Sequence, residues 1–171
     1  ATVDPPRQDG ATPLFVASQE GHREVAVLLL ERNATVDQPA QGAATPLYIA
    51  SQEDHAEVVA LLLEHKAAVD QPDDEGTTPL FIASQQGHRD VAALLLEHKA
   101  TVEQPKQDGA TPLFIASQEG HREVAALLLE HKATVDQPSW DGATPLFIAS
   151  QKCHREVAAL LLEARATVDQ A

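Results

Sequence analysis

Apolar and polar residues alternate in blocks along the whole chain, and the same arrangement returns every 33 residues. Each block opens on a threonine–proline pair, first at Thr12, which predicts a short helix because threonine is a good N-cap and proline fits the first helical turn. Gly21 ends that helix, and the almost wholly apolar run from Val25 to Leu30 predicts a second helix that is buried on most sides. The stretch from Thr35 onward contains proline, aspartate and glycine, which indicates an extended turn or hairpin.

The repeat is strict in both sequence and spacing. The pattern Thr-Pro-Leu followed by Phe or Tyr begins at Thr12, Thr45, Thr78, Thr111 and Thr144. A fixed period in this range indicates stacked structural units. Because such short helices are marginal alone in water, each unit must bury its apolar face on its neighbours. We therefore expect one elongated domain of ten helices, none longer than about 12 residues, with Leu94 buried centrally and Leu160 covered on one side only.

Several features of the repeat together resemble the ankyrin repeat. They are the Thr-Pro-Leu signature, the Gly-His pair that follows it, the Leu-Leu-Leu run and the Ala-Thr-Val-Asp segment, and they extend over the whole chain. The resemblance implies an all-α, ankyrin-repeat solenoid of stacked helix–turn–helix units joined by hairpin-like loops, forming a single domain over 1–171. The predicted repeats are 7–39, 40–72, 73–105, 106–138 and 139–171.

Residues 1–6 match the tail of a preceding repeat, since their sequence is nearly that of 34–39. The chain therefore opens in the middle of a repeat and contains no methionine. We interpret it as a fragment of a longer array or as a designed protein.

The chain departs from the family pattern at three repeat positions. The usual fourth residue of Thr-Pro-Leu-His is aromatic here, for which we expect packing between repeats. Gly between the helices is kept in three repeats but is Asp54 and Cys153 in the others. The family also favours Gly after the second helix, where this chain has Asn33, Lys66, Lys99, Lys132 and Arg165. A left-handed side chain there costs roughly 1–2 kcal/mol, so we expect mild strain or an altered turn.

The chain is strongly acidic, with a formal net charge of −14. The charge is concentrated in the middle, since the five repeats carry −2, −4, −4, −2 and −1 in chain order. Such a surface repels nucleic acid and anionic membrane, whose binding requires basic patches. It would attract a basic protein or peptide, although acidity can also serve solubility alone. No apolar run is long enough to span a bilayer, and we expect a monomer inside the cell, in the cytoplasm.

Eight histidines raise the question of metal binding or catalysis. Five of them share one repeat position and three share another, so each set forms a ladder along the stack. Equivalent positions on neighbouring helices lie about 8–10 Å apart, which is too far for two ligands of one zinc ion. There is no glycine-rich phosphate loop and no distinctive nucleophile–base pair. We therefore expect no metal site, no cofactor and no enzymatic activity.

Surface recognition remains, and the resemblance implies that it uses the concave side of the array. This side would consist of the loop tips, here called fingers, and the exposed face of the first helix of each repeat. The candidate residues are Asp9, Gln19, Glu20, Gln52, Glu53, Asp74, Glu75, Gln85, Gln86, Asp108, Gln118, Glu119, Trp140, Asp141, Gln151 and Lys152. Lys152 is the only basic residue in this set, so we expect a partner to present Lys or Arg near Glu53, Asp74 and Glu75.

Trp140 is the one aromatic residue expected at a finger tip, because its counterparts are Gln or Asp. It is a recognition residue, a side chain folded against the neighbouring finger, or a product of ordinary sequence drift. Three functions remain open: a protein–protein interaction scaffold with an acidic groove, a structural spacer from a longer array, and a designed, consensus-like scaffold without a natural partner.

Overall fold

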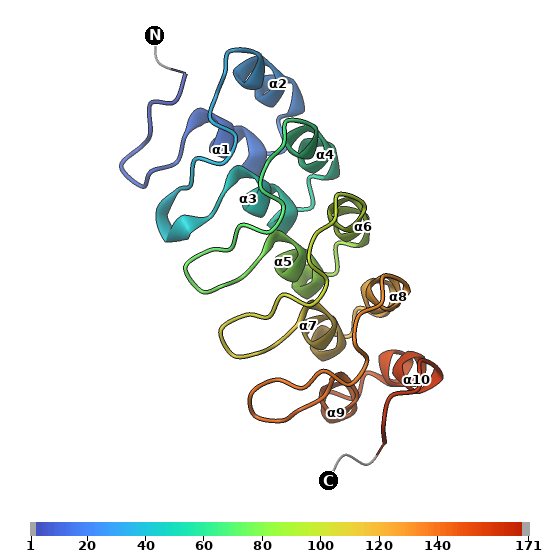
Figure 1. Cartoon of the computed structure of the whole chain (residues 1–171). Helices are drawn as coiled ribbons and strands as arrows, with labels where there is room; N and C mark the ends of the chain where they lie inside the picture. Colours follow the sequence, from blue (N-terminus) through green and yellow to red (C-terminus); the bar gives the residue numbers. More distant parts are fainter. Residues whose placement is uncertain (1–2, 169–171) are drawn as a thin grey trace.

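The computed structural model describes residues 3–168, which form an elongated stack of helix pairs (Figure 1). An inner helix next to the finger alternates with an outer helix behind it, and each helix has seven to nine residues. The inner helices are α1 (Pro13–Gln19), α3 (Pro46–Gln52), α5 (Pro79–Gln86), α7 (Pro112–Glu119) and α9 (Pro145–Gln151). The outer helices are α2 (Arg23–Glu31), α4 (Ala56–Glu64), α6 (Arg89–Glu97), α8 (Arg122–Glu130) and α10 (Arg155–Glu163). The predicted all-α solenoid with ten short helices is confirmed for this part of the chain.

The inner helices begin as the sequence predicts. The hydroxyl of Thr78 accepts a hydrogen bond from the backbone N–H of Phe81 at 3.2 Å, and Pro79 occupies the first helical position. This cap satisfies one of the backbone donors that a helix leaves free at its start. The same arrangement is present at each of the five threonine–proline pairs.

The backbone turns left-handed between the two helices of each repeat. Gly87 has a φ of +80°, and the non-glycine residues at the equivalent position, Asp54 and Cys153, both have a φ of +61°. An L-residue with a side chain adopts this conformation at a cost that glycine avoids. The fold therefore keeps the same turn in all five repeats and accepts local strain in two of them.

A second left-handed turn follows each outer helix, at the residues where the family pattern has glycine. Asn33, Lys66, Lys99, Lys132 and Arg165 have φ values between 63° and 68°. At Lys99 the turn is closed by hydrogen bonds from the backbone N–H groups of Lys99 and Ala100 to the carbonyls of Leu96 and Leu95. The sequence left open whether the turn changes or the residue is strained. The turn keeps its left-handed conformation, so the strain falls on these five residues.

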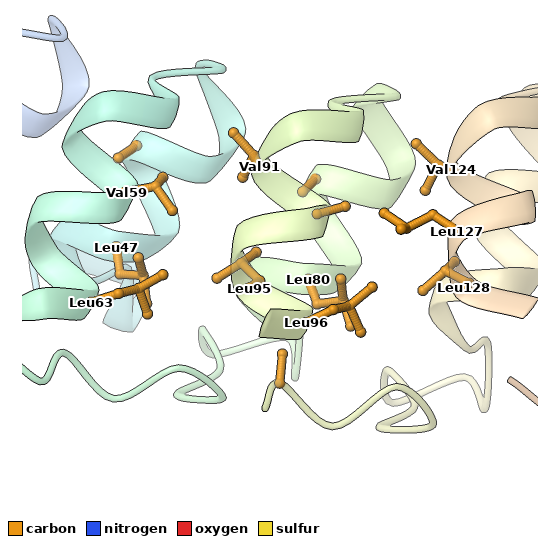
Figure 2. Packing of buried hydrophobic residues seen from close by; sticks show 14 of the residues in the cluster. Leu47, Val59, Leu63, Leu80, Val91, Leu95, Leu96, Val124, Leu127 and Leu128 are labelled. Carbon is orange, nitrogen blue, oxygen red and sulfur yellow. The ribbon is translucent and has the colours of Figure 1, made fainter. Parts of the chain in front are cut away.

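One hydrophobic cluster runs through the whole stack, from the first repeat to the last. Figure 2 shows its middle part, where side chains from inner and outer helices of successive repeats fill the layer between them. Leu47, Leu80 and Leu113 of the inner helices are completely buried, as are Leu95 and Leu128 of the outer helices. The core is therefore shared between repeats, with no single centre, as expected for a solenoid.

The predicted burial of apolar faces between neighbouring repeats is confirmed, but the predicted burial of Leu94 is wrong. Leu94 is only partly buried, whereas its neighbour Leu95 is completely buried. Leu160 is also partly buried. The aromatic ladder packs as expected in its first four members, and Phe147 in the last described repeat is 58% exposed.

The fingers are tight hairpin-like loops that contain no β-strand within residues 3–168. In the first finger the backbone N–H of Arg7 donates to the carbonyl of Ala11, and Gly10 at the tip has a positive φ. The second finger contains a short 3₁₀ turn, Gln41–Ala43. Neighbouring fingers are also joined directly, for example from the N–H of Gln41 to the carbonyl of Asp9 at 2.8 Å.

Candidate interaction surface

The candidate residues fall into two rows on the finger side of the stack. One row follows the finger tips and comprises Asp9, Asp74, Glu75, Asp108, Trp140 and Asp141, all of them exposed. The other row lies at the carboxyl ends of the inner helices and comprises Gln19, Glu20, Gln52, Glu53, Gln85, Gln86, Gln118, Glu119, Gln151 and Lys152. Gln52, Gln85 and Gln118 are half-buried, and the other members of this row are exposed. The two rows are called the finger row and the helix-end row below.

The aspartates of the finger row also hold their own turns. Oδ1 of Asp9 accepts a hydrogen bond from the N–H of Ala11, and Oδ1 of Asp108 does the same from Ala110. In the fifth finger, Oδ1 of Asp141 accepts from the Ser139 hydroxyl and from the N–H of Ala143. These contacts, with the hydroxyl as the largest cause, lower the pKa of Asp141. The carboxylates are thus fixed in place and Asp141 stays ionised.

The third finger is built differently from the others. Asp73, which the sequence analysis did not select, accepts hydrogen bonds from the N–H groups of Glu75 and Thr77 at 2.9 and 2.8 Å. Its carboxylate also faces Tyr48 of the preceding inner helix. Burial, followed by the charge of Asp73, raises the pKa of the Tyr48 hydroxyl. Asp73 therefore joins the second and third repeats.

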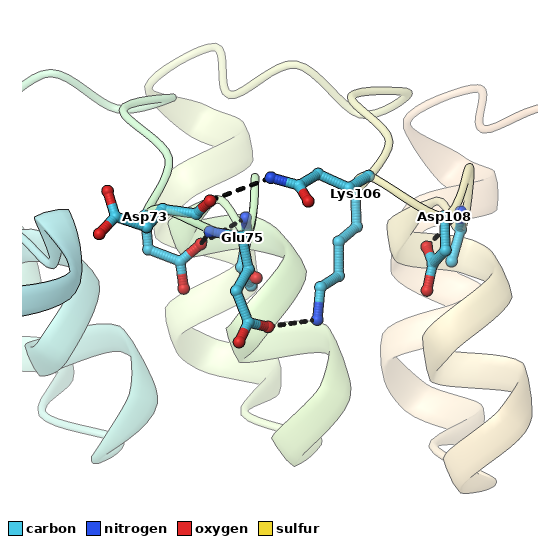
Figure 3. Close-up of polar contacts among 8 residues, drawn as sticks. Asp73, Glu75, Lys106 and Asp108 are labelled. Carbon is cyan, nitrogen blue, oxygen red and sulfur yellow. Dashed lines mark hydrogen bonds and ion pairs between the residues drawn. The ribbon is translucent and has the colours of Figure 1, made fainter.

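Two basic residues outside the candidate set reach the finger row, Lys106 and Arg7. Nζ of Lys106 lies 2.9 Å from Oε2 of Glu75 on the preceding finger (Figure 3). This hydrogen bond raises the pKa of Lys106. A guanidinium nitrogen of Arg7 lies 3.6 Å from Asp9, with both side chains exposed. These pairs were not predicted because Arg7 and Lys106 occupy the first position of their repeats, outside the candidate set. Arg7 meets an acid two residues later, and Lys106 meets an acid on the preceding finger.

The helix-end row is joined to the histidine ladder. Nε2 of His55 lies 2.9 Å from the carbonyl oxygen of Gln19 in the preceding repeat. The same contact recurs at 2.8–3.0 Å for the next three members of the ladder, His88, His121 and His154. The backbone of the helix-end row therefore has a structural role, while its side chains remain at the surface.

The histidines show no arrangement typical of a metal centre. The rings of His65, His98 and His131 each place Nδ1 near a carbonyl of their own helix, at 2.9–3.0 Å. Together with the ladder above, these bonds give seven of the eight rings a backbone partner. No group of three or more potential ligand side chains lies close enough to hold an ion within residues 3–168.

The serine ladder is also structural. Ser51, Ser84, Ser117 and Ser150 each donate to the carbonyl four residues earlier at 2.7 Å. Ser18 at the same repeat position is buried, and its hydroxyl has no partner in the described structure.

Trp140 lies against the preceding finger and still exposes 79% of its surface. A methyl group placed on Gly109 would come within 2.3 Å of its indole ring, so the ring covers the glycine of the fourth finger. The interpretation that the ring folds against the neighbouring finger is therefore confirmed for one side of the residue, and the rest of the ring is exposed. The ring borders a groove of about 450 Å³ between the fourth and fifth repeats.

No helix in the described part of the chain is long and apolar enough to cross a membrane.

Comparison with known families agrees with the repeat geometry. A family model described as "Ankyrin repeats (3 copies)" matches residues 33–106 and 100–171, and one described as "Ankyrin repeat" matches residues 9–41. A search of curated proteins finds no match. The matched ranges extend over almost the whole chain, including both rows of candidate residues.

Proposed function

The chain belongs to the ankyrin-repeat family, and from this membership we propose that it is a non-catalytic scaffold that binds a basic protein or peptide segment on its concave side. Ankyrin repeats are generally protein-interaction modules. The concave side corresponds to the finger row and the helix-end row. We also propose that the chain acts without a cofactor and in the cytoplasm.

The observation that supports a basic partner is the charge balance of the two rows. Eight exposed carboxylates belong to them: Asp9, Glu20, Glu53, Asp74, Glu75, Asp108, Glu119 and Asp141. Among the described residues, Lys106 pairs with Glu75 and Arg7 with Asp9, which leaves an excess of negative charge. An extended cationic segment would be attracted to such a surface, with the largest effect on association rate and selectivity.

The pairing of Glu75 changes which residues we propose to meet the partner first. Its carboxylate already contacts Lys106, so a partner would have to compete for it. Asp74, Glu53 and Glu119 are exposed and have no ion pair within the part of the chain that the structure describes. We therefore propose these three as the carboxylates that steer the partner.

A structural spacer is the second candidate function. It is favoured by the unbroken core and by the hydrogen-bond ladders, which repeat from unit to unit and need no ligand. A spacer, or a designed scaffold without a natural partner, would show no preference for basic segments on one face.

Selection from a phage-displayed library of random peptides tests the proposed function. The bait is the 171-residue chain, compared with a variant in which Glu53, Asp74 and Glu119 are replaced by Lys. The control variant replaces Glu24, Glu57 and Glu64 on outer helices by Lys, which changes the net charge equally. We expect Lys- and Arg-rich peptides to be enriched on the wild type and on the control and to be lost on the test variant.

Two results would contradict the proposal. Equal loss on both variants would mean that net charge alone attracts the peptides. No enrichment on the wild type at low salt would favour the spacer.

A further inference from the structure

We propose that the groove between the fourth and fifth repeats is a subsite for an arginine side chain flanked by an apolar residue of the partner. The inference rests on the proposed function and deepens it, because it assigns one position of the basic segment to one place on the surface. It is carried by the shape of the groove, the position of Trp140 and the unequal pairing of the finger carboxylates.

The groove combines an apolar floor with a polar rim. Its floor and walls include Ala110, Ala143, Phe114 and Ile148, which come from the fourth and fifth fingers and the helices behind them. Its rim includes Asp108, Asp141, Gln118 and Gln151. A volume of about 450 Å³ is enough for side chains of a bound segment. An apolar residue would cover the floor while a neighbouring polar group remains at the rim.

Trp140 forms a wall of the groove and packs on the fourth finger. Its backbone N–H donates to the carbonyl of Asp108 at 3.1 Å, and its indole covers Gly109. Because a Cβ at Gly109 would collide with the ring, the absence of a side chain there allows this packing. The five other large apolar side chains that are strongly exposed, namely Val25, Leu28, Phe147, Leu162 and Val168, lie in the first and last repeats, where one neighbour is missing from the described stack. Trp140 also lies in the last repeat, and its ring is exposed at the finger tip although it packs on the fourth finger.

The carboxylates at this groove differ from Asp9 and Glu75, which have basic neighbours. Asp9 lies beside Arg7, and Glu75 is paired with Lys106. Asp108 and Asp141 use one oxygen, Oδ1, for their own turns and make no ion pair among residues 3–168. Their second oxygens are therefore available to an incoming cation.

The combination of an indole and two fixed carboxylates favours arginine over lysine. A guanidinium group is planar, so it can stack on the indole face and still donate hydrogen bonds to a carboxylate at its edge. A lysine ammonium is a compact, strongly hydrated charge that makes no comparable stacking contact. A basic segment with arginine beside leucine or valine would therefore be preferred here.

The fluorescence of Trp140 reports directly on this groove because it is the only tryptophan of the chain. The probe is a capped tripeptide, leucyl-arginyl-leucine amide, and the reference peptides replace arginine by lysine or by glutamine. We expect a saturable change in emission that weakens with salt. The arginine peptide should bind about two- to fivefold more tightly than the glutamine peptide, with the lysine peptide between them.

Matched variants separate the groove from general acidity. Asp108→Asn combined with Asp141→Asn keeps the Oδ1 acceptors of the turns and removes both charges, so binding should weaken about two- to fivefold. Asp9→Asn at the equivalent position of the first finger should leave it unchanged. Trp140→Gln introduces the residue found at the same position of three other repeats and should weaken binding. Because this variant has no tryptophan, its binding would be measured by amide chemical shifts.

The inference is overturned if the arginine and glutamine peptides bind equally, if Asp9→Asn weakens binding as much as the double variant, or if no saturable change occurs. Failure of the proposed function looks different. If the library selection yields basic peptides whose contacts map to Glu53 and Asp74, the scaffold function stands and only this subsite is wrong.

Discussion

Leu61 and Leu28 occupy the same position of the outer helix in two successive repeats and test how much one repeat stabilises the next. Leu61 on α4 is 6% exposed, whereas Leu28 on α2 is 58% exposed. The difference arises because no described repeat covers α2 on its outer flank. The structure therefore supplies two copies of one side chain that differ mainly in burial.

The expected loss of stability follows from this burial. Leu61→Ala removes a side chain from the shared core and should lower the free energy of unfolding by about 2–5 kcal/mol. Leu28→Ala removes less than half as much buried surface and should cost about 1 kcal/mol. Urea denaturation followed by circular dichroism gives both values by linear extrapolation, provided that the slope with urea is the same in all three proteins.

Either of two results would contradict this picture of stacked outer helices. Equal losses would show that Leu28 is covered in solution, for example by another copy of the chain, which would also contradict the expected monomer. A loss below about 1 kcal/mol for Leu61→Ala would show that the outer helices do not stack as the structure has them.

Three other predictions concern the ladders and Tyr48. His121→Ala removes the hydrogen bond to the preceding repeat and should lower the free energy of unfolding by about 0.5–1.5 kcal/mol in urea melts. His22→Ala should lower it less, because the ring of His22 has no partner in residues 3–168, and equal losses would contradict the ladder. Because the pKa of Tyr48 is raised in the folded state, its contribution to stability is present below pH about 10 and is lost at higher pH. Tyr48→Phe should therefore flatten the fall of the unfolding free energy above that pH, and an unchanged pH dependence would contradict this contribution. Added Zn²⁺ should leave Tm unchanged, and a rise saturating near one ion per chain would revive a metal site.

The sequence was sufficient to predict the repeat architecture because its signals are local. The threonine–proline pairs, the glycine turn and the apolar run each specify a start, a stop or a buried face within one unit. The strict period then fixes how units stack. The choice between Leu94 and Leu95 as the buried residue was beyond this reasoning, since an unbroken Leu-Leu-Leu run has no polar position to mark its exposed side.

The candidate surface was harder to predict because its chemistry is set between repeats. Lys106 meets Glu75, and Trp140 covers Gly109, only because successive fingers lie side by side. Asp73 was overlooked because in the first, fourth and fifth fingers the turn-holding aspartate stands two residues later. The partner-binding role of the selected residues remains a prediction.

The most direct test of the central claim is an amide chemical-shift map of the isotope-labelled chain bound to the most strongly enriched library peptide. Shifts should concentrate on the finger row and the helix-end row, from Glu53 to Asp141, and the outer helices should change little. Shifts confined to the outer helices, on the side of Glu24 and Glu57, would contradict recognition by the concave side.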